Sequence, residues 1–176
     1  VEALCEKLTD WCGNIVFYCV PFTELQEALR DNCPEELFTV LMRRLMVKIA
    51  NRICAANDYG AIITGESVAQ VASQTLPAIF CTNAAAEYPV FRPVIGMDKR
   101  EIVDVARHID TFEVSTLPYE DCCTVFSPKH PKTRPSLEEI LAAEASFDFE
   151  PLIEKAVRET EVKQFKYGVR NVDLDM

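Results

Sequence analysis

Two adjacent cysteines, Cys122 and Cys123, lie in a polar, acidic segment typical of a turn, directly after a glutamate and an aspartate. A thiol buried in a core is inert, whereas a thiol at a turn beside charged groups can ionise, attack and carry a sulfur atom. A basic, proline-stiffened run follows at residues 127–135. Its cationic side chains include Lys129, Lys132 and Arg134. Because a candidate nucleophile precedes a candidate anion-binding surface, we expect chemistry on a phosphorylated or polyanionic partner.

The other six of the eight cysteines stand singly among apolar or helical neighbours, where cysteine behaves as a small hydrophobe. With no C-x-x-C pair and only two histidines, the sequence argues against a structural zinc site. The chain shows no signal peptide and is long enough for a core, so a disulfide framework is not expected either. We therefore expect no metal site and a cytoplasmic protein with reduced thiols.

The composition indicates one soluble globular unit. Of the 176 residues, 49% are hydrophobic, yet no apolar run approaches the length of a membrane span, and we expect no membrane partner. The formal net charge of −10 argues against nucleic-acid binding by the whole surface and leaves local basic patches for that role. The chain begins at Val1 without an initiator methionine, which suggests a fragment.

Strand-like and helix-like segments alternate along the chain. The predicted strands span residues 14–20, 61–64 and 88–95, of which the first two are apolar enough to be buried. The predicted helices span residues 34–57, ended by Gly60, and 151–163, and others begin at the capping-box residues Ser67, Asp98 and Ser136. Residues 164–176 are expected to fray. This order predicts an α/β layer sandwich around a parallel sheet.

Gly65 follows the predicted strand that ends at Thr64. Ligands of such sheets bind beyond the carboxyl ends of the strands, and a residue without a side chain lets a ligand touch the backbone there. Gln74 lies about two turns into the helix predicted from Ser67, where its amide could contact a base or a phosphate. The alternative interpretation is that these residues form an ordinary connection between a strand and a helix, without a ligand. Both interpretations remain open.

A basic stripe precedes that strand. Arg44, Lys48 and Arg52 recur at a spacing of four on the predicted helix, and Arg43 projects from a neighbouring position. Such a stripe is usually a solvated surface, with phosphate binding as the alternative. We expect His108 to be a packing or surface residue, and Trp11 to be part of the core contact of the first helix.

Four separated segments together resemble the tRNA 4-thiouridine synthetase family, also called tRNA sulfurtransferase or thiamine biosynthesis protein. The segments are TVLMRRLM at 39–46, TGESVAQVASQTL at 64–76, RPVIGMDK at 92–99 and PYEDCCTVF at 118–126. They follow one another in the family's order and span nearly the whole chain. The resemblance implies a parallel-sheet three-layer sandwich of the adenine nucleotide alpha-hydrolase type, the fold of pyrophosphate-loop ATPases.

The same resemblance implies a reaction and its site. ATP with magnesium would adenylate a tRNA uridine, and sulfur would arrive as a persulfide from a cysteine desulfurase to make 4-thiouridine. Arg43, Gly65 and Gln74 would contact ATP, Cys122 would carry the sulfur, and Cys123 is a candidate auxiliary thiol. The candidate tRNA or phosphate contacts are Arg44, Lys129, Lys132 and Arg134. Sulfur supply to thiamine synthesis through a sulfur-carrier protein, and a homodimer, are further expectations.

Two features of the family are missing from this sequence. The 176 residues contain neither the S-G-G-x-D-S phosphate loop with its strand nor the RNA-binding region that precedes it. They also lack the C-terminal rhodanese-like domain that some members of the family carry. We therefore expect residues 1–135 to form part of the ATPase domain, and residues 136–176 a helical extension of it. Another pyrophosphate-loop tRNA-modifying enzyme or a ligase of that fold, and a non-catalytic docking fragment, remain as alternatives.

Overall fold

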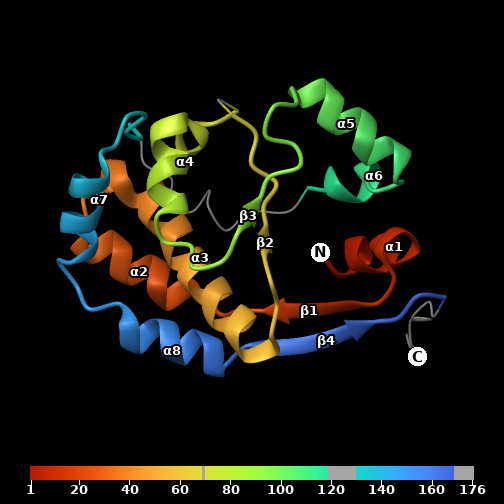
Figure 1. The fold of residues 1–176 in the computed structure, drawn as a ribbon, viewed down its shortest axis with the longest axis horizontal. Helices are drawn as coiled ribbons and strands as arrows, with labels where there is room; N and C mark the ends of the chain where they lie inside the picture. The colour runs from red at the N-terminus through yellow and green to blue at the C-terminus, as the bar shows by residue number, and fades with distance from the viewer. Residues whose placement is uncertain (69, 119–129, 169–176) are drawn as a thin grey trace. The chain divides into compact units, whose positions relative to one another are not determined.

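The computed structural model describes residues 1–68, 70–118 and 130–168 (Figure 1). These residues divide into two compact units. The first unit holds the described parts of Val1–Val20, Lys99–Tyr119 and Thr160–Met176, and the second holds those of Pro21–Asp98 and Glu120–Glu159. Among the described residues, no helix is long and apolar enough to cross a membrane.

The second unit is built around the long helix α3 (Phe38–Asn57), which runs between α4 and α8 in Figure 1. Leu41 and Leu45 on α3 are completely buried. The other helices of this unit are α2 (Thr23–Asn32), η1 (Glu35–Leu37), η2 (Ala72–Gln74), α4 (Leu76–Asn83), α7 (Leu137–Glu144) and α8 (Glu150–Arg158). Helices α2, α4, α7 and α8 all pack on α3, so the apolar periodicity of the sequence predicted the central helix of this unit correctly.

The first end of α3 differs from the prediction, because a separate 3-10 turn, η1, occupies the residues before Phe38. The predicted last residue, Asn57, is confirmed. The residue that ends the helix is Asp58, in a left-handed conformation with φ of 57°, and not Gly60. Aspartate is one of the few residues besides glycine that adopts this conformation readily, and the prediction had given that role to the glycine.

A short parallel pair of strands lies beside α3 in the second unit. Strand β2 (Ile62–Ile63) pairs with β3 (Val90–Phe91) in parallel, with Ile62 opposite Val90. Ile62 packs with Val47 and Cys54 of α3, but Ile63 is 70% exposed. The parallel strand is confirmed, and the expectation that all of it is buried is wrong, because successive side chains of a strand point to opposite faces.

The capping-box predictions had mixed results. Ser136 caps α7, since its hydroxyl accepts the N–H of Glu139 at 3.2 Å. No helix begins at Ser67, whose hydroxyl donates to the carbonyl of Met97 at 2.7 Å. The helix starts later, at α4, where the Thr75 hydroxyl accepts the N–H of Ala78.

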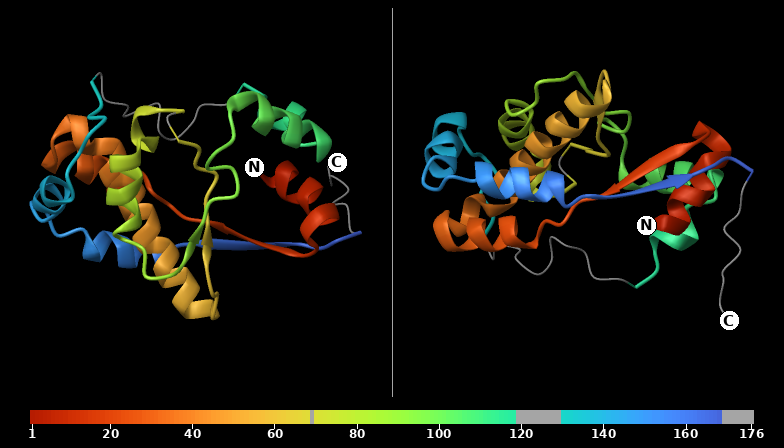
Figure 2. Two further views of the ribbon diagram at one scale, coloured as in Figure 1. Left: turned by 45° about the horizontal axis from the view of Figure 1, so that its top comes forward. Right: turned by 90° about the horizontal axis from the view of Figure 1, so that it is seen from below.

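The first unit contains α1 (Glu2–Cys12), β1 (Ile15–Cys19), α5 (Lys99–His108), α6 (Phe112–Ser115) and β4 (Glu161–Phe165). Helix α5 begins next to Asp98, as predicted. Strands β1 and β4 run side by side in both views of Figure 2 and pair antiparallel, with Ile15 opposite Phe165.

This antiparallel pair corrects three expectations. The strand predicted at residues 14–20 exists, but it is only partly buried and has an antiparallel partner. The last helix ends at Arg158, and residues 161–165, predicted as helix and then frayed end, form β4. The aromatic rings of Phe17 and Phe165 meet edge to face with centroids 6.3 Å apart. Such cross-strand pairs stabilise a sheet in a way that the charged sequence of this segment did not indicate.

The described part of residues 136–168 contributes to both units. Helices α7 and α8 pack on α3 in the second unit, whereas β4 pairs with β1 in the first. The division predicted after residue 135 therefore does not coincide with a boundary between the two compact units.

Candidate functional site

A cavity of about 390 Å³ opens in the second unit between α3, α4 and the ends of β2 and β3. Its apolar wall includes Met42, Met46, Val47, Val71 and Val90. Its polar side chains include Arg43, Thr64, Glu66, Gln74, Asn83 and Arg92. A largely apolar wall with a few convergent polar groups is typical of a small-molecule site.

Glu66 is the most buried of these polar side chains, with 2% of it exposed. One carboxylate oxygen accepts a hydrogen bond from Nη2 of Arg43 at 2.6 Å. The other accepts one from Nε of Arg92 at 2.6 Å and one from the Thr64 hydroxyl at 2.9 Å. Glu66 thus joins α3 to the segments that follow β2 and β3.

The electrostatics of this cluster favour an anionic ligand. Burial acts to raise the pKa of Glu66, but the Arg92 hydrogen bond and the charge of Arg43 outweigh it, and the net pKa is lowered. One ionised carboxylate between two guanidinium groups leaves a net positive charge at the cavity. Arg43 keeps 22% of its side chain exposed, although its Nε is buried without a hydrogen-bond partner among the described residues.

Gln74 lines the same cavity from η2. Its Oε1 accepts the backbone N–H of Ser67 at 3.1 Å, and a backbone N–H can bond only to the oxygen of the amide. The orientation of the amide is therefore fixed by its partner. The NH₂ group is left to donate, so a ligand atom that meets Gln74 has to be an acceptor.

Gly65 lies between two residues of the cavity wall, Thr64 and Glu66. It is exposed, and a methyl group added to it would meet no atom within 4 Å. The fold therefore does not require a glycine here for space. A side chain at this position would occupy the approach to the backbone between the two wall residues.

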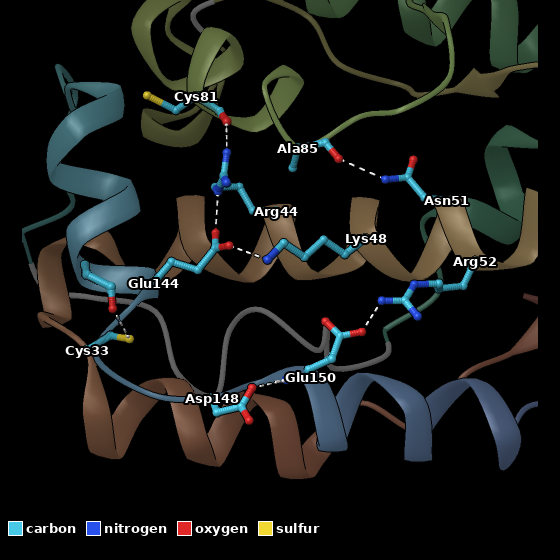
Figure 3. Close-up of polar contacts among 11 residues, drawn as sticks. Cys33, Arg44, Lys48, Asn51, Arg52, Cys81, Ala85, Glu144, Asp148 and Glu150 are labelled. Carbon is cyan, nitrogen blue, oxygen red and sulfur yellow. Dashed lines mark hydrogen bonds and ion pairs between the residues drawn. The ribbon is translucent and has the colours of Figure 1, made fainter.

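Arg44, Lys48 and Arg52, the basic stripe of α3, form ion pairs with glutamates of neighbouring helices (Figure 3). Arg44 is only 3% exposed, and its guanidinium donates to Glu144 of α7 at 2.6 Å and to the Cys81 carbonyl of α4 at 2.5 Å. Lys48 also pairs with Glu144, and Arg52 pairs with Glu150 of α8. The expectation of a solvated stripe is wrong for Arg44, because neighbouring helices cover it. Its donors are directed at protein partners, and we do not retain it as a phosphate contact.

The candidate residues of the basic run are only partly described. Lys132 forms an ion pair with Glu139, and its backbone N–H donates to the Glu36 carbonyl at 3.0 Å. Arg134 is exposed and has no ion-pair partner among the described residues. Cys122, Cys123 and Lys129 lie outside the described residues. Lys132 and Arg134 are not part of the cavity wall.

Trp11 and His108 belong to the first unit. Their ring centroids are 5.5 Å apart, and the two rings border an open hollow of about 910 Å³. Trp11 is 56% exposed, so the expectation that it joins a core contact is wrong. His108 is exposed and its ring is tilted against that of Trp11, in agreement with the packing or surface role expected for it. None of the candidate site residues that the structure describes lines this hollow.

Sequence reasoning missed Glu66 and Arg92. Each follows a strand of the parallel pair, Glu66 three residues after β2 and Arg92 directly after β3. The rule that placed Gly65 at the carboxyl edge of the sheet applies equally to both of them. That shared position was the signal that could have identified the pair.

Comparison with known proteins shows the family of this chain. Residues 1–149 match the family described as thiamine biosynthesis protein (ThiI). The chain belongs to this family. Among ThiI relatives, a probable tRNA sulfurtransferase of Alkaliphilus metalliredigens is 52% identical over 164 residues, which are 93% of this chain and 42% of the relative. A probable tRNA sulfurtransferase of Brevibacillus brevis is 44% identical over 176 residues, 100% of this chain and 44% of the relative.

A solved structure of a relative agrees with this assignment. The crystal structure of a 4-thiouridine synthetase in complex with RNA and bound ATP superposes with a TM-score of 0.88 and 32% identity. The match covers 94% of this chain and 44% of that one. The α/β fold expected from the resemblance is thus confirmed, and a pyrophosphate-loop type fits the family. The chain spans about two fifths of the length of the relatives it matches.

Proposed function

We propose that the protein carrying this chain is an ATP-dependent tRNA sulfurtransferase, and that the cavity of the second unit is part of its ATP site. One observation carries the proposal. Arg43, Gln74 and both neighbours of Gly65 line a single cavity, although they come from separate segments of the sequence. The ThiI resemblance implies ATP contacts at Arg43, Gln74 and Gly65 itself. The bound ATP in the related structure supports the same choice.

Each side chain fits a distinct part of a nucleotide. The Arg43 guanidinium is partly exposed at the cavity and suits a phosphate oxygen, to which charge-assisted hydrogen bonds are strong. The NH₂ group of Gln74 suits an acceptor on the base or the sugar. The apolar wall around Met42, Val47 and Val90 suits the flat face of a base.

Magnesium would enter with the triphosphate. Among the described residues no group of three or more His, Cys, Asp or Glu side chains could hold a metal ion. Glu66 is also occupied by two arginines. We infer that phosphate oxygens of the nucleotide and water molecules are among the ligands of the ion, since magnesium in such sites binds substrate phosphates and keeps several waters.

The reaction follows from the chemistry of uridine. The oxygen of its C4 carbonyl is a poor leaving group. When this oxygen attacks the α-phosphate of ATP, pyrophosphate is lost and the oxygen becomes part of an AMP group, which leaves more readily. The terminal sulfur of a persulfide on Cys122 then attacks the C4 carbon, and AMP leaves with the oxygen. A second thiol, Cys123 or an external one, attacks the carrier sulfur to release thiouridine. The resulting disulfide has to be reduced before another cycle.

The sulfur needs a donor, and we infer a cysteine desulfurase that hands its persulfide to Cys122. The family name supports a second destination for the sulfur, thiamine thiazole synthesis through a sulfur-carrier protein. A homodimer remains part of the proposal as well.

The proposal is tested by assaying the intact protein with tRNA, magnesium and a persulfide donor, with and without ATP. We expect near-ultraviolet absorbance of thiouridine to appear only when ATP is present. The matched control replaces ATP with a non-hydrolysable analogue that cannot be cleaved between its α- and β-phosphates. Thiouridine formed without ATP, or none formed with it, would refute the proposed function.

A further inference from the structure

Three charged side chains from different segments meet at one end of the cavity. Arg43 projects from α3, Glu66 follows β2, and Arg92 follows β3. We propose that Glu66 is a positioning residue, which holds the guanidinium groups of Arg43 and Arg92 in the orientation that receives the nucleotide. This inference rests on the proposed function, since it concerns the same cavity.

The geometry gives each arginine its own carboxylate oxygen. Both hydrogen bonds are 2.6 Å long, and the Thr64 hydroxyl shares the oxygen that Arg92 uses. Arg92 is held from the other side by Oδ1 of Asn83 on α4, at 3.1 Å. An arginine side chain has many rotamers in water, and two fixed ends remove most of them before a ligand arrives.

The charges require this arrangement. Two guanidinium groups that line one cavity repel each other unless an anion lies between them. Glu66 supplies that anion and is itself almost fully buried. Since one negative charge does not neutralise two positive ones, the cluster still attracts a phosphate.

A second largely buried carboxylate, Glu144 of α7, also pairs with cations of α3 and shows what a purely structural cluster looks like. Glu144 accepts hydrogen bonds from Arg44 and Lys48 of α3, but none of the three residues lines the cavity. The arginines on Glu66 both line it and keep some exposure, 22% for Arg43 and 15% for Arg92. The two glutamates are therefore a matched pair, one facing the ligand site and one remote from it.

The test compares Glu66→Gln with Glu144→Gln in the intact protein, by calorimetric titration with ATP and magnesium. Both variants should lower the melting temperature, because each leaves buried cations without a counter-ion. We expect Glu66→Gln to weaken ATP binding by about tenfold, the loss typical of one charge-assisted contact. Glu144→Gln should bind ATP as the unsubstituted protein does. Glu66→Asp keeps the charge and should bind ATP more tightly than Glu66→Gln does. If Glu66→Gln does not fold, Glu66→Asp is compared with Glu144→Gln in its place.

A double-mutant cycle separates positioning from stability. If Glu66 acts through Arg43, then adding Glu66→Gln to Arg43→Ala should weaken ATP binding by clearly less than it does alone. Fully additive losses, or equal ATP affinities of Glu66→Gln and Glu144→Gln, would overturn the inference while leaving the proposed function intact. Absence of ATP binding by the unsubstituted protein would overturn both.

Discussion

Arg43 and Arg44 are consecutive residues of one helix, and their side chains have different environments. Successive residues of an α-helix differ in direction by about 100°. Arg43 therefore reaches Glu66 at the cavity, while Arg44 reaches Glu144 under the cover of α4 and α7. The sequence shows two adjacent cations, and only the packing of the helix decides which one is available to a ligand.

The first prediction concerns Gly65. Replacing it with valine should change the free energy of unfolding by no more than about 0.5 kcal/mol, because the added carbon meets open space. ATP affinity should fall strongly, because the side chain blocks access to the backbone. Calorimetric titration and thermal unfolding measure the two effects. The control is Gly60→Val, another position with open space that does not line the cavity and should affect neither quantity.

The second prediction concerns Gln74. In Gln74→Glu a carboxylate can still accept the N–H of Ser67, so the fold should be kept. The variant cannot donate to a ligand and places a negative charge near the phosphates, so ATP should bind at least about tenfold more weakly. Gln70→Glu makes the same charge change at an exposed position outside the cavity wall and should bind ATP normally. Equal affinities of the two variants would contradict the contact.

At the scale of elements, α3 is tied to its neighbours by ion pairs as well as by leucines. Arg44 and Lys48 share Glu144 on α7, and Arg52 reaches Glu150 on α8. The spacing of four predicted the stripe itself. The glutamates that pair with it lie about a hundred residues further along the chain, so no local pattern could predict these ion pairs or the burial of Arg44.

The third prediction follows from this arrangement. Removing the charge in Glu144→Gln leaves Arg44 buried without a counter-ion, and we expect a loss of about 3 to 5 kcal/mol in unfolding free energy. Urea unfolding measures it. The control Glu150→Gln breaks an ion pair whose partners are about half exposed, and it should cost no more than about 1 kcal/mol. Similar losses in both variants would contradict the assignment of Arg44 to the interior.

The stability that Glu144 contributes through Arg44 and Lys48 depends on pH, and the sign of this dependence follows from its pKa shift. Burial acts to raise the pKa of Glu144, but the hydrogen bonds and charges of Arg44 and Lys48 outweigh it and lower the pKa overall. A carboxyl group with a lowered pKa stabilises the fold above its unfolded value of about 4.3, and this stability is lost as the pH falls. The stability difference between the unsubstituted protein and Glu144→Gln should therefore shrink below about pH 4.

Local signals were enough for some elements and not for others. Ser136 and Ser67 carry the same capping signature, yet only Ser136 begins a helix, while the Ser67 hydroxyl donates to the carbonyl of Met97, thirty residues away. Strand β4 has a charged, helix-compatible sequence and becomes a strand through its pairing with β1. In the candidate site, Arg43 and Gln74 were predicted from the family resemblance. Glu66 and Arg92 were found only when the ends of β2 and β3 were seen to meet.

At the scale of the whole molecule, the cavity supplies only one half of the proposed chemistry. The sulfur half rests on Cys122 and Cys123, which lie outside the described residues, and the relatives are more than twice as long as this chain. The intact protein is therefore the object to assay. The acidic net charge of −10 also leaves tRNA binding by this part to local cations such as the exposed Arg134.

The fourth prediction separates the two halves of the reaction. Because a hydroxyl cannot hold a persulfide, Cys122→Ser should abolish sulfur transfer to tRNA and leave ATP binding unchanged. Cys123→Ser should have a milder effect, or should permit a single turnover only if Cys123 is the second thiol. Transfer of radiolabelled sulfur by each variant measures this. Full activity of Cys122→Ser with loss in Cys123→Ser would assign the carrier to the other cysteine.

The central claim, that this cavity binds ATP through Arg43, is tested most directly by one titration. ATP binding to the intact protein should be compared for Arg43→Ala and for Arg52→Ala, an arginine on the same helix that pairs with Glu150 instead. We expect Arg43→Ala to weaken binding by about tenfold or more, through loss of a contact of about 1.5 to 3 kcal/mol, and Arg52→Ala to leave it unchanged. Unchanged affinity in Arg43→Ala would contradict the account.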